Sequence, residues 1–437
     1  MRYIPLHTVI RALFVLACLG CMAADAAAGR AAGRPVLGIS VFGHDRVSRD
    51  AVLDAAGIEI GAPWSRALAD SARARIKRLA GVEFVTVRRL RTGVREEGVR
   101  LVIEITEGGT VSFRPVLRRN ATNRVGFGVG VVERNFRGRN ERLGAWFALR
   151  GGTVVAASWR TAPVGDLPRF EWGIDARWSG YDYPFPDAGD LLLDERVDRV
   201  EAALSCRLRL PAGFSVIVAP GIDLIEVAEP MVTGDWQAGA PDQPAGLFTA
   251  IETAVELDRR QRRFYPRSGF LLSVSRRDWG VLQSGAEMKN HRWEGRGALF
   301  VPLGRTIAAV EVEGASVHGR VPLLLRRHIG GEYTIRGREF GDFVGEYSIV
   351  QRSELRIPLN FDELDDIGNP IILVDCHLFW DAGVVWTPPE ELERDRVHSG
   401  FGIGLRLIPR IGVEAAVGCG WHLEGNGNFY LELSTGS

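Results

Sequence analysis

The side chains that most often carry out catalysis are scattered along this chain of 437 residues. Its histidines lie too far apart for a motif such as His-Glu-x-x-His, and there is no Gly-x-Ser-x-Gly nucleophile motif and no Walker loop. His377 is close in sequence to Asp375 and Asp381, a set that could bind a metal, but charge pairing between strands is the simpler interpretation. We therefore predict a protein that is not an enzyme and that needs no metal or cofactor.

Residues 1–28 have the pattern of a secretory signal peptide. A positively charged start precedes a short apolar stretch at 12–22, and small residues follow, with cleavage expected after Ala26 or Ala28. This pattern predicts an exported protein. The cysteines that survive cleavage are odd in number and far apart, so no disulfide framework is expected among Cys206, Cys376 and Cys419.

The composition excludes several classes of protein. The 54 basic side chains balance 54 acidic ones, which speaks against a nucleic-acid partner. After residue 22 no apolar run approaches the roughly 20 residues that a membrane-spanning helix needs. Branched and aromatic residues are too plentiful for a disordered chain. A soluble globular protein and a membrane β-barrel remain, and the order of the residues distinguishes them.

Residues 35–109 are expected to form a small α+β domain. Ser48 is a plausible helix N-cap, and the second helix has an apolar stripe at Ala69, Ala72, Ile76 and Leu79. Turn signals at Gly57, Gly81 and Thr92-Gly93 separate the elements. The predicted β-α-α-β-β order is a strand at 36–41, helices at 48–57 and 65–81, and strands at 84–90 and 99–105.

From residue 110 to 437 the helical period gives way to strict alternation of apolar and polar residues. The run at 199–210 alternates over 12 residues, and four of the six positions on its polar face are charged. A water-soluble sandwich also alternates, but its strands usually have about five or six residues. Short and long connections also alternate, as they do in outer-membrane barrels. We predict sixteen antiparallel strands in a transmembrane β-barrel, near 111–120, 125–134, 141–150, 153–160, 170–179, 195–209, 214–225, 245–258, 269–278, 285–300, 306–316, 346–359, 371–385, 398–408, 411–421 and 427–433.

Two motifs give the chain a family resemblance. The longest connection contains Ile329-Gly-Gly-Glu-Tyr-Thr-Ile-Arg-Gly-Arg-Glu-Phe340, and a later strand contains Phe379-Trp-Asp-Ala-Gly383. With these motifs and its β-α-α-β-β segment, the chain resembles the BamA/TamA-like superfamily of outer-membrane assembly barrels, the bacterial surface antigen family. The resemblance implies that residues 35–109 are a polypeptide-transport-associated (POTRA) domain, which in this family receives extended polypeptide at a sheet edge.

The resemblance also implies a site inside the barrel. In the family, the long loop folds into the lumen, where its arginine meets an acidic residue on a nearby strand. Such an arginine and carboxylate can form a bidentate, charge-assisted pair that pins the loop. Arg338 departs from the family pattern, which has an aromatic residue there. The expected loop motif is Gly330, Gly331, Ile335, Arg336 and Gly337, and the acidic partner strands contribute Asp381, Gly383 and Glu354.

The function expected from this resemblance is assembly, insertion or translocation of other proteins at the outer membrane of a Gram-negative cell, with the POTRA domain in the periplasm. The implied partners are unfolded outer-membrane or secreted polypeptides, outer-membrane lipid, and periplasmic chaperones or accessory subunits, but no nucleic acid. One alternative is a passive pore or structural barrel. Another is a dedicated secretion transporter, a class that usually has two POTRA domains and a plug helix, for which residues 29–34 leave no room.

Overall fold

The computed structural model describes residues 34–90, 98–119, 125–149, 152–163, 169–186, 192–227, 246–262, 265–282, 289–319, 325–331, 333–339, 342–359, 372–387, 397–409, 413–423 and 427–435. The chain divides into two compact units, Met1–Gly108 and Gly109–Ser437. The expected signal peptide lies outside the described residues. No helix in the described part of the chain is long and apolar enough to cross a membrane.

The amino-terminal unit is a three-stranded sheet with two helices. Its elements are β1 (Val36–Phe42), α2 (Arg49–Ala56), α3 (Arg66–Ile76), β2 (Val82–Leu90) and β3 (Val99–Glu107). The sheet order is β1-β3-β2, with β1 parallel and β2 antiparallel to β3. Apolar side chains of all five elements form one buried core. The β-α-α-β-β order agrees with the expected elements.

Serine side chains begin both helices of this unit. Ser48 accepts a hydrogen bond from the backbone N–H of Ala51, and Ser65 accepts one from Leu68. Each bond satisfies a backbone donor that the first helical turn leaves without a partner. The second helix is shorter than expected, because α3 ends at Ile76 rather than near Gly81. Leu79 packs against the core from the turn that follows, so its apolar spacing belongs to the core and not to a longer helix.

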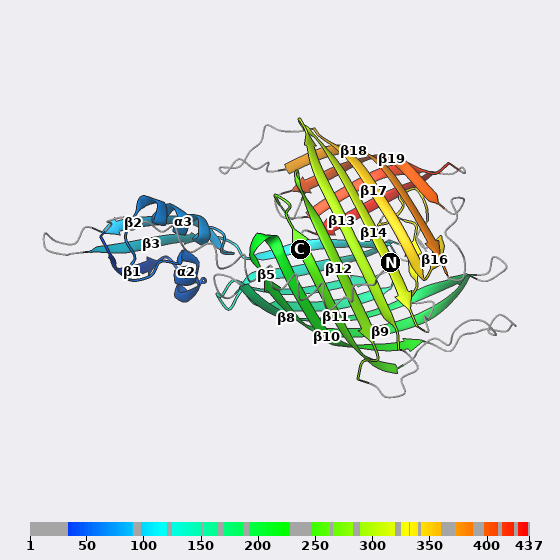
Figure 1. The fold of residues 1–437 in the computed structure, drawn as a ribbon, viewed down its shortest axis with the longest axis horizontal. Coiled ribbons are helices and arrows are strands. Elements are labelled where there is room, and N and C mark those ends of the chain that lie inside the picture. The colour runs from blue at the N-terminus through cyan, green and yellow to red at the C-terminus, as the bar shows by residue number, and fades with distance from the viewer. Residues whose placement is uncertain are drawn as a thin grey trace, which may run out of the picture. The chain divides into compact units, whose positions relative to one another are not determined.

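The carboxy-terminal unit is one large antiparallel sheet of sixteen strands (Figure 1). In space, neighbours follow the chain order throughout, except that β14 pairs directly with β17. Each expected strand overlaps one observed strand. The strands are β4 (Val111–Arg119), β5 (Val125–Phe136), β6 (Glu141–Leu149), β7 (Thr153–Arg160), β8 (Arg169–Pro186), β9 (Leu192–Arg209), β10 (Phe214–Val227), β11 (Gly246–Asp258), β12 (Gly269–Trp279), β13 (His291–Leu303), β14 (Thr306–His318), β17 (Tyr347–Pro358), β18 (Ile372–Trp386), β19 (His398–Pro409), β20 (Val413–Trp421) and β21 (Gly427–Thr435).

The two faces of the large sheet differ in polarity. One face exposes apolar side chains at every second position, such as Leu272 and Val274 on β12 and Leu299 on β13. The other face carries the charged positions, such as Arg277 on β12 and Glu294 on β13. We call the first the outer face and the second the inner face. The free cysteines among the described residues are Cys206, Cys376 and Cys419, as expected from their spacing.

The connection between β14 and β17 has structure of its own. Within it, β15 (Arg327–Ile329) and β16 (Phe343–Gly345) form a two-stranded antiparallel hairpin. Cα atoms of both hairpin strands lie within 8 Å of Cα atoms of β18. The hairpin is a sheet of its own and does not pair with the strands of the large sheet. The residues between β15 and β16 include the segment around Arg336. The connection therefore brings its motif to the inner face.

Candidate functional site

Arg336 forms a buried charge cluster on the inner face. Its side chain is fully buried, and its Nε and Nη2 donate to the two carboxylate oxygens of Asp381, each at 2.7 Å. The backbone N–H of Arg336 donates to the same carboxylate at 3.0 Å, and Nη1 donates to Glu354 Oε1 at 2.5 Å. The planar guanidinium thus binds one carboxylate in a bidentate manner through Nε and Nη2 and a second carboxylate through Nη1. Lysine cannot reproduce this arrangement.

Strand alternation and register position the two carboxylates. On β18 the side chains of Asp375, His377, Phe379 and Asp381 are buried on the inner face, while the intervening residues point to the outer face. Glu354 on β17 lies opposite Phe379 in the antiparallel register, one inner-face position from Asp381. A shift of one residue in this register would turn the strand's side chains to the other face. The site therefore depends on the pairing of β17 with β18.

Glu354 is shared among three cations. Besides Arg336, it accepts hydrogen bonds from Arg406 Nη2 at 3.1 Å to both oxygens and from Arg356 Nε at 2.8 Å. Its side chain is 8% exposed and that of Arg406 is 3% exposed. A buried carboxylate is tolerated when such partners satisfy its lone pairs. The cluster therefore joins the loop, β17 and β19 through one acidic side chain.

Burial and charge act in opposite directions on the pKa of Arg336. Burial lowers it, but the hydrogen bonds to Asp381 and the negative charges of Asp381 and Glu354 outweigh burial and raise the pKa above its ordinary value. Arginine is already charged at all physiological pH values. The guanidinium of Arg336 is therefore charged within the cluster.

The backbone of the loop lies directly on glycines of the neighbouring strands. A Cβ atom on Gly400 would stand 1.9 Å from the carbonyl oxygen of Arg336, and one on Gly420 would stand 2.7 Å from the backbone nitrogen of Gly337. Gly337 itself has φ +93°, a conformation that side chains rarely adopt. The ring of Phe379 also contacts the loop, because its centroid lies 4.0 Å from Cζ of Arg336, within cation–π distance.

Apolar contacts seat the residue that precedes the arginine. Ile335 is fully buried in a cluster with Ile329 and Val350. A Cβ on Gly383 would come within 3.0 Å of Ile335 Cδ1, so the glycine of the β18 motif leaves room for this side chain. The motif thus combines an apolar contact and an ion pair at adjacent positions.

The two glycines at the start of the motif shape the loop. Gly330 has φ +116°, and a Cβ there would stand 2.1 Å from the carbonyl oxygen of Glu339. Thr334 Oγ1 both accepts from the N–H of Gly330 at 2.7 Å and donates to its carbonyl at 2.8 Å. Gly331, with φ +87°, donates its N–H to the carbonyl of Arg338 at 3.1 Å. These bonds close a compact turn that presents Arg336 to the sheet.

Arg338, the departure from the family motif, contacts a ring instead of supplying one. Its Cζ lies 5.5 Å from the ring centroid of Phe343 on β16. Phe340, the other aromatic residue of the motif, lies outside the described residues. Among the described residues, Phe343 therefore supplies an aromatic ring to Arg338.

Arg327 is a second attachment point that the sequence analysis missed. It lies on β15, and its Nη1 donates to Glu294 at 3.0 Å while Nη2 contacts Glu313. These carboxylates belong to β13 and β14, so the connection is held to four strands of the sheet in total. No motif marked Arg327, because an arginine in a long loop has no local signal for distant carboxylates.

A second buried cluster lies beside the first. The sequence analysis considered its His377 and Asp375, but not Tyr430 and Arg406. His377 Nδ1 is 3.4 Å from Asp375 Oδ1, and its Nε2 is 2.6 Å from the hydroxyl of Tyr430 on β21. Asp375 is also 3.6 Å from Arg406 Nη1. His377 and Asp375 are fully buried, and Asp381 interacts with Arg336 rather than with them. In the described part of the chain, no group of three or more His, Cys, Asp or Glu side chains is placed to hold a metal ion.

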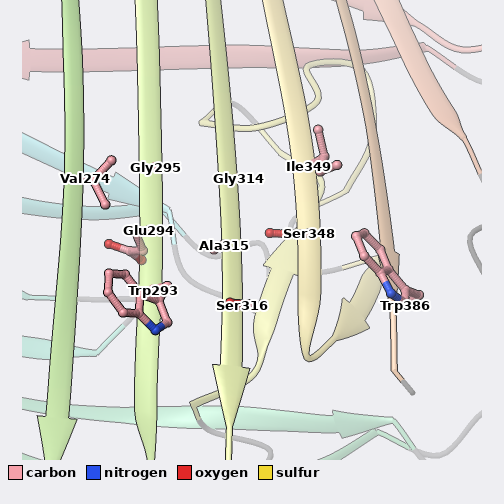
Figure 2. A pocket seen from close by; sticks show the side chains of 10 residues that line it. All are labelled: Val274, Trp293, Glu294, Gly295, Gly314, Ala315, Ser316, Ser348, Ile349 and Trp386. Atoms are coloured by element: carbon pink, nitrogen blue, oxygen red, sulfur yellow. The ribbon is translucent and has the colours of Figure 1, made fainter. Parts of the chain in front are cut away.

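A shallow groove of about 260 Å³ lies elsewhere on the sheet (Figure 2). Its floor includes Gly295 and Gly314, which face each other across β13 and β14, and its lining includes Val274, Trp293 and Trp386. None of the residues that bind Arg336 lines it. The inner-face cluster is therefore the better candidate for the functional site.

Comparison with known proteins points to one family. The family model of the Omp85 superfamily domain matches residues 237–412, a range that includes Arg336, Glu354 and Asp381. A search of curated proteins finds no match.

Solved structures show the same fold at low sequence identity. The crystal structure of BamA from Haemophilus ducreyi lacking POTRA domains 1–3 has a TM-score of 0.65 at 16% identity, over 93% of this chain and 84% of that one. CdiB from Acinetobacter baumannii has a TM-score of 0.59 at 13% identity, over 91% and 73% of the two chains. CdiB from Escherichia coli has a TM-score of 0.60 at 13% identity, over 92% and 75%. The sixteen-stranded sheet thus belongs to a BamA-like fold.

Proposed function

We propose that the chain belongs to the Omp85 superfamily, whose domain model matches residues 237–412, and that it inserts or translocates other polypeptides at the outer membrane. The observation that carries the proposal is the fully buried Arg336, held by carboxylates of two neighbouring strands in a BamA-like fold. Members of this superfamily are transporters and assembly factors, and we assign no enzymatic activity to this chain.

We propose that residues 110–437 close into a sixteen-stranded transmembrane barrel. The edge strands of the sheet are β4 and β21, and Cα atoms of the two lie within 8 Å of each other. The apolar outer face suits lipid, and the charged inner face suits a wet lumen. In a closed barrel the contact of β4 with β21 is a seam, and a seam that opens offers unpaired backbone groups to an incoming strand.

We propose that residues 35–109 form a periplasmic POTRA domain, exported by the signal peptide at 1–28. The strand β2 is an edge of the small sheet, and Phe84 on it is exposed. An edge strand can add an extended peptide through backbone hydrogen bonds, with exposed side chains contributing selectivity. Unfolded outer-membrane or secreted polypeptides, delivered by periplasmic chaperones or accessory subunits, are the partners that this edge fits.

Within this proposal Arg336 keeps the long connection folded against the inner wall of the barrel. The pair is shielded from water, so its attraction is strong and its loss leaves a buried charge without compensation. A loop held in this way presents one surface to a passing polypeptide. The loop motif Gly330, Gly331, Ile335, Arg336 and Gly337, with Asp381, Gly383 and Glu354, is therefore the proposed functional site.

Depletion of the protein in its own cells tests the proposal. Quantitative proteomics of the outer membrane should show reduced levels of other folded barrels, whereas inner-membrane proteins should be unchanged. Loss of a single secreted protein, with normal barrel levels, would instead identify dedicated translocation. If neither barrel levels nor secretion changes, the proposal is wrong and a passive pore or structural barrel is the better interpretation.

A further inference from the structure

Tyr430 is buried although it lies on the last strand of the sheet. Its side chain is 2% exposed, and β21 pairs through its backbone with β20 at one edge of the strand order. A large side chain on an edge strand is usually accessible to solvent from at least one direction, so specific contacts must bury Tyr430. These contacts lie on the inner face, and they include a residue of β18, which β20 and β19 separate from β21.

The hydroxyl of Tyr430 reaches His377 on β18, with the oxygen 2.6 Å from Nε2. It reaches this far because the strands between them carry glycines at the facing positions Gly404 and Gly418. A Cβ on Gly404 would stand 2.3 Å from the Tyr430 hydroxyl, and one on Gly418 would stand 2.7 Å from its ring. The interaction therefore crosses β19 and β20 over the backbone of Gly404 and Gly418.

The same tyrosine contacts the seat of the loop. Its ring meets Phe379 edge to face, with centroids 5.5 Å apart and planes at 82°. The Phe379 ring also contacts the guanidinium of Arg336, whose Cζ lies 4.0 Å from the ring centroid. Three packed side chains thus connect the pinned loop with the terminal strand.

We propose that Tyr430 and His377 form a tie that holds β21 in the sheet, and that the seated Arg336 reinforces this tie through Phe379. The inference rests on the proposed function in one respect, namely that the edge of β21 is where the barrel opens. Tyr430 and His377 are then positioning residues for the seam. Release of the loop would loosen the last strand, and so couple the state of the lumen to the availability of the edge.

Hydrogen–deuterium exchange of the purified full-length protein tests the tie. Tyr430→Phe keeps the ring and removes the hydroxyl, so backbone amides of 427–435 should exchange about five- to tenfold faster, as expected for one lost buried hydrogen bond. His377→Leu should have the same effect, and the double variant should exchange no faster than either single variant. Additive effects, or unchanged exchange in β21, would overturn the proposal.

The control uses the same chemistry in another place. Tyr347 Oη is 3.1 Å from His318 Nδ1, a tyrosine–histidine contact between β17 and β14. Tyr347→Phe should leave the exchange of β21 unchanged, and the exchange of β9 to β13 should be the same in all variants. A general increase across the sheet would mean a folding defect and would contradict a local tie.

The variant Arg336→Ala tests whether the docked loop reinforces the contact of Tyr430 with His377. Arg336→Ala should accelerate exchange in β21 less than Tyr430→Phe does, and only when Tyr430 is intact. If Arg336→Ala leaves β21 unchanged, the reinforcement through Phe379 is overturned. The exchange rates of the purified protein do not depend on client assembly. A negative depletion experiment would therefore refute the proposed function and leave the tie intact, and unchanged exchange in β21 would refute the tie and leave the proposed function intact.

Discussion

At the scale of single residues, Arg336 combines functions that no other residue could supply together. Its Nε and Nη2 donate to both carboxylate oxygens of Asp381, its Nη1 donates to Glu354, and its guanidinium plane contacts the ring of Phe379. Each contact uses a different part of the guanidinium. Lysine has one compact ammonium and could satisfy only part of this set, so Arg336→Lys is not a conservative change here.

Removal of either charge of the buried pair should release the loop. Arg336→Ala and Asp381→Ala should each destabilise the docked loop by about 3–5 kcal/mol, because each leaves a buried charge without its partner. The double variant should be no worse than the single ones, and exchange of amides in 333–339 together with client assembly measures this.

An exposed pair provides the comparison for this prediction. Arg160 and Asp175 lie 2.9 Å apart with side chains 49% and 40% exposed. Exposed pairs contribute roughly 0–1 kcal/mol, so Arg160→Ala should have little effect on either readout. Additive losses in the Arg336 and Asp381 double variant would show that the two residues do not act as a pair in the protein.

A single methyl group should also displace the loop. In Gly400→Ala the new Cβ would stand 1.9 Å from the carbonyl oxygen of Arg336, so the loop backbone would have to move. We expect faster protease cleavage within the connection and weaker client assembly. Gly295→Ala is the matched control, because no atom lies within 4 Å of its added Cβ and the change is also on a strand. Equal effects of the two substitutions would refute the steric explanation.

At the scale of elements, the long connection behaves as a structured part of the unit. Arg327 attaches β15 to carboxylates of β13 and β14. Arg336, in the segment between β15 and β16, attaches that segment to carboxylates of β17 and β18. Two separated ion-pair attachments restrict a loop more than one does, because each removes conformations that the other still permits.

Loss of the first attachment should free the hairpin before it frees the motif. Arg327→Ala removes the contacts with Glu294 and Glu313, so amides of 327–329 and 343–345 should exchange faster. Amides of 333–339 should change less, since Arg336 and Asp381 still pair. Exchange that rises equally in both segments would show that the connection is released as one unit.

At the scale of the whole molecule, the two compact units have different roles in the proposed function. The small unit has its own apolar core, and the large sheet has its own strand pairing. The division of the chain at Gly108 and Gly109 therefore separates a unit that could receive polypeptide from one that could admit it to the membrane.

Deletion of residues 35–108 from the mature protein tests this division. The remaining sheet should still migrate as a folded, heat-modifiable species in cold SDS gels, because its strand pairs do not include the deleted residues. Client assembly in depleted cells should be lost. Full activity of the shortened protein would show that polypeptide is not received by the small unit.

Local sequence patterns predicted the sixteen strands that the described residues form in the large sheet, and the order of elements in the small unit. Alternation has a period of two and helical stripes have a period of 3.6, and both are local patterns that survive without any knowledge of the fold. The same alternation places Asp381 on one face of its strand with Asp375, His377 and Phe379, which are buried with it. The roles of the motif residues stay a proposal, although the structure brings Arg336, Asp381 and Glu354 together.

Contacts between residues far apart in the chain could not be predicted from local patterns. The contacts of Arg327 with β13 and β14, of Arg406 with Glu354, and of Tyr430 with His377 depend on strand register and on the path of a long connection. None of these pairs has a sequence spacing that a local pattern can report. The end of α3 at Ile76 shows the same limit, since Leu79 keeps helical spacing while packing from a turn. Local periodicity determines which face a side chain occupies, but the partner it finds there is set by long-range pairing of the backbone.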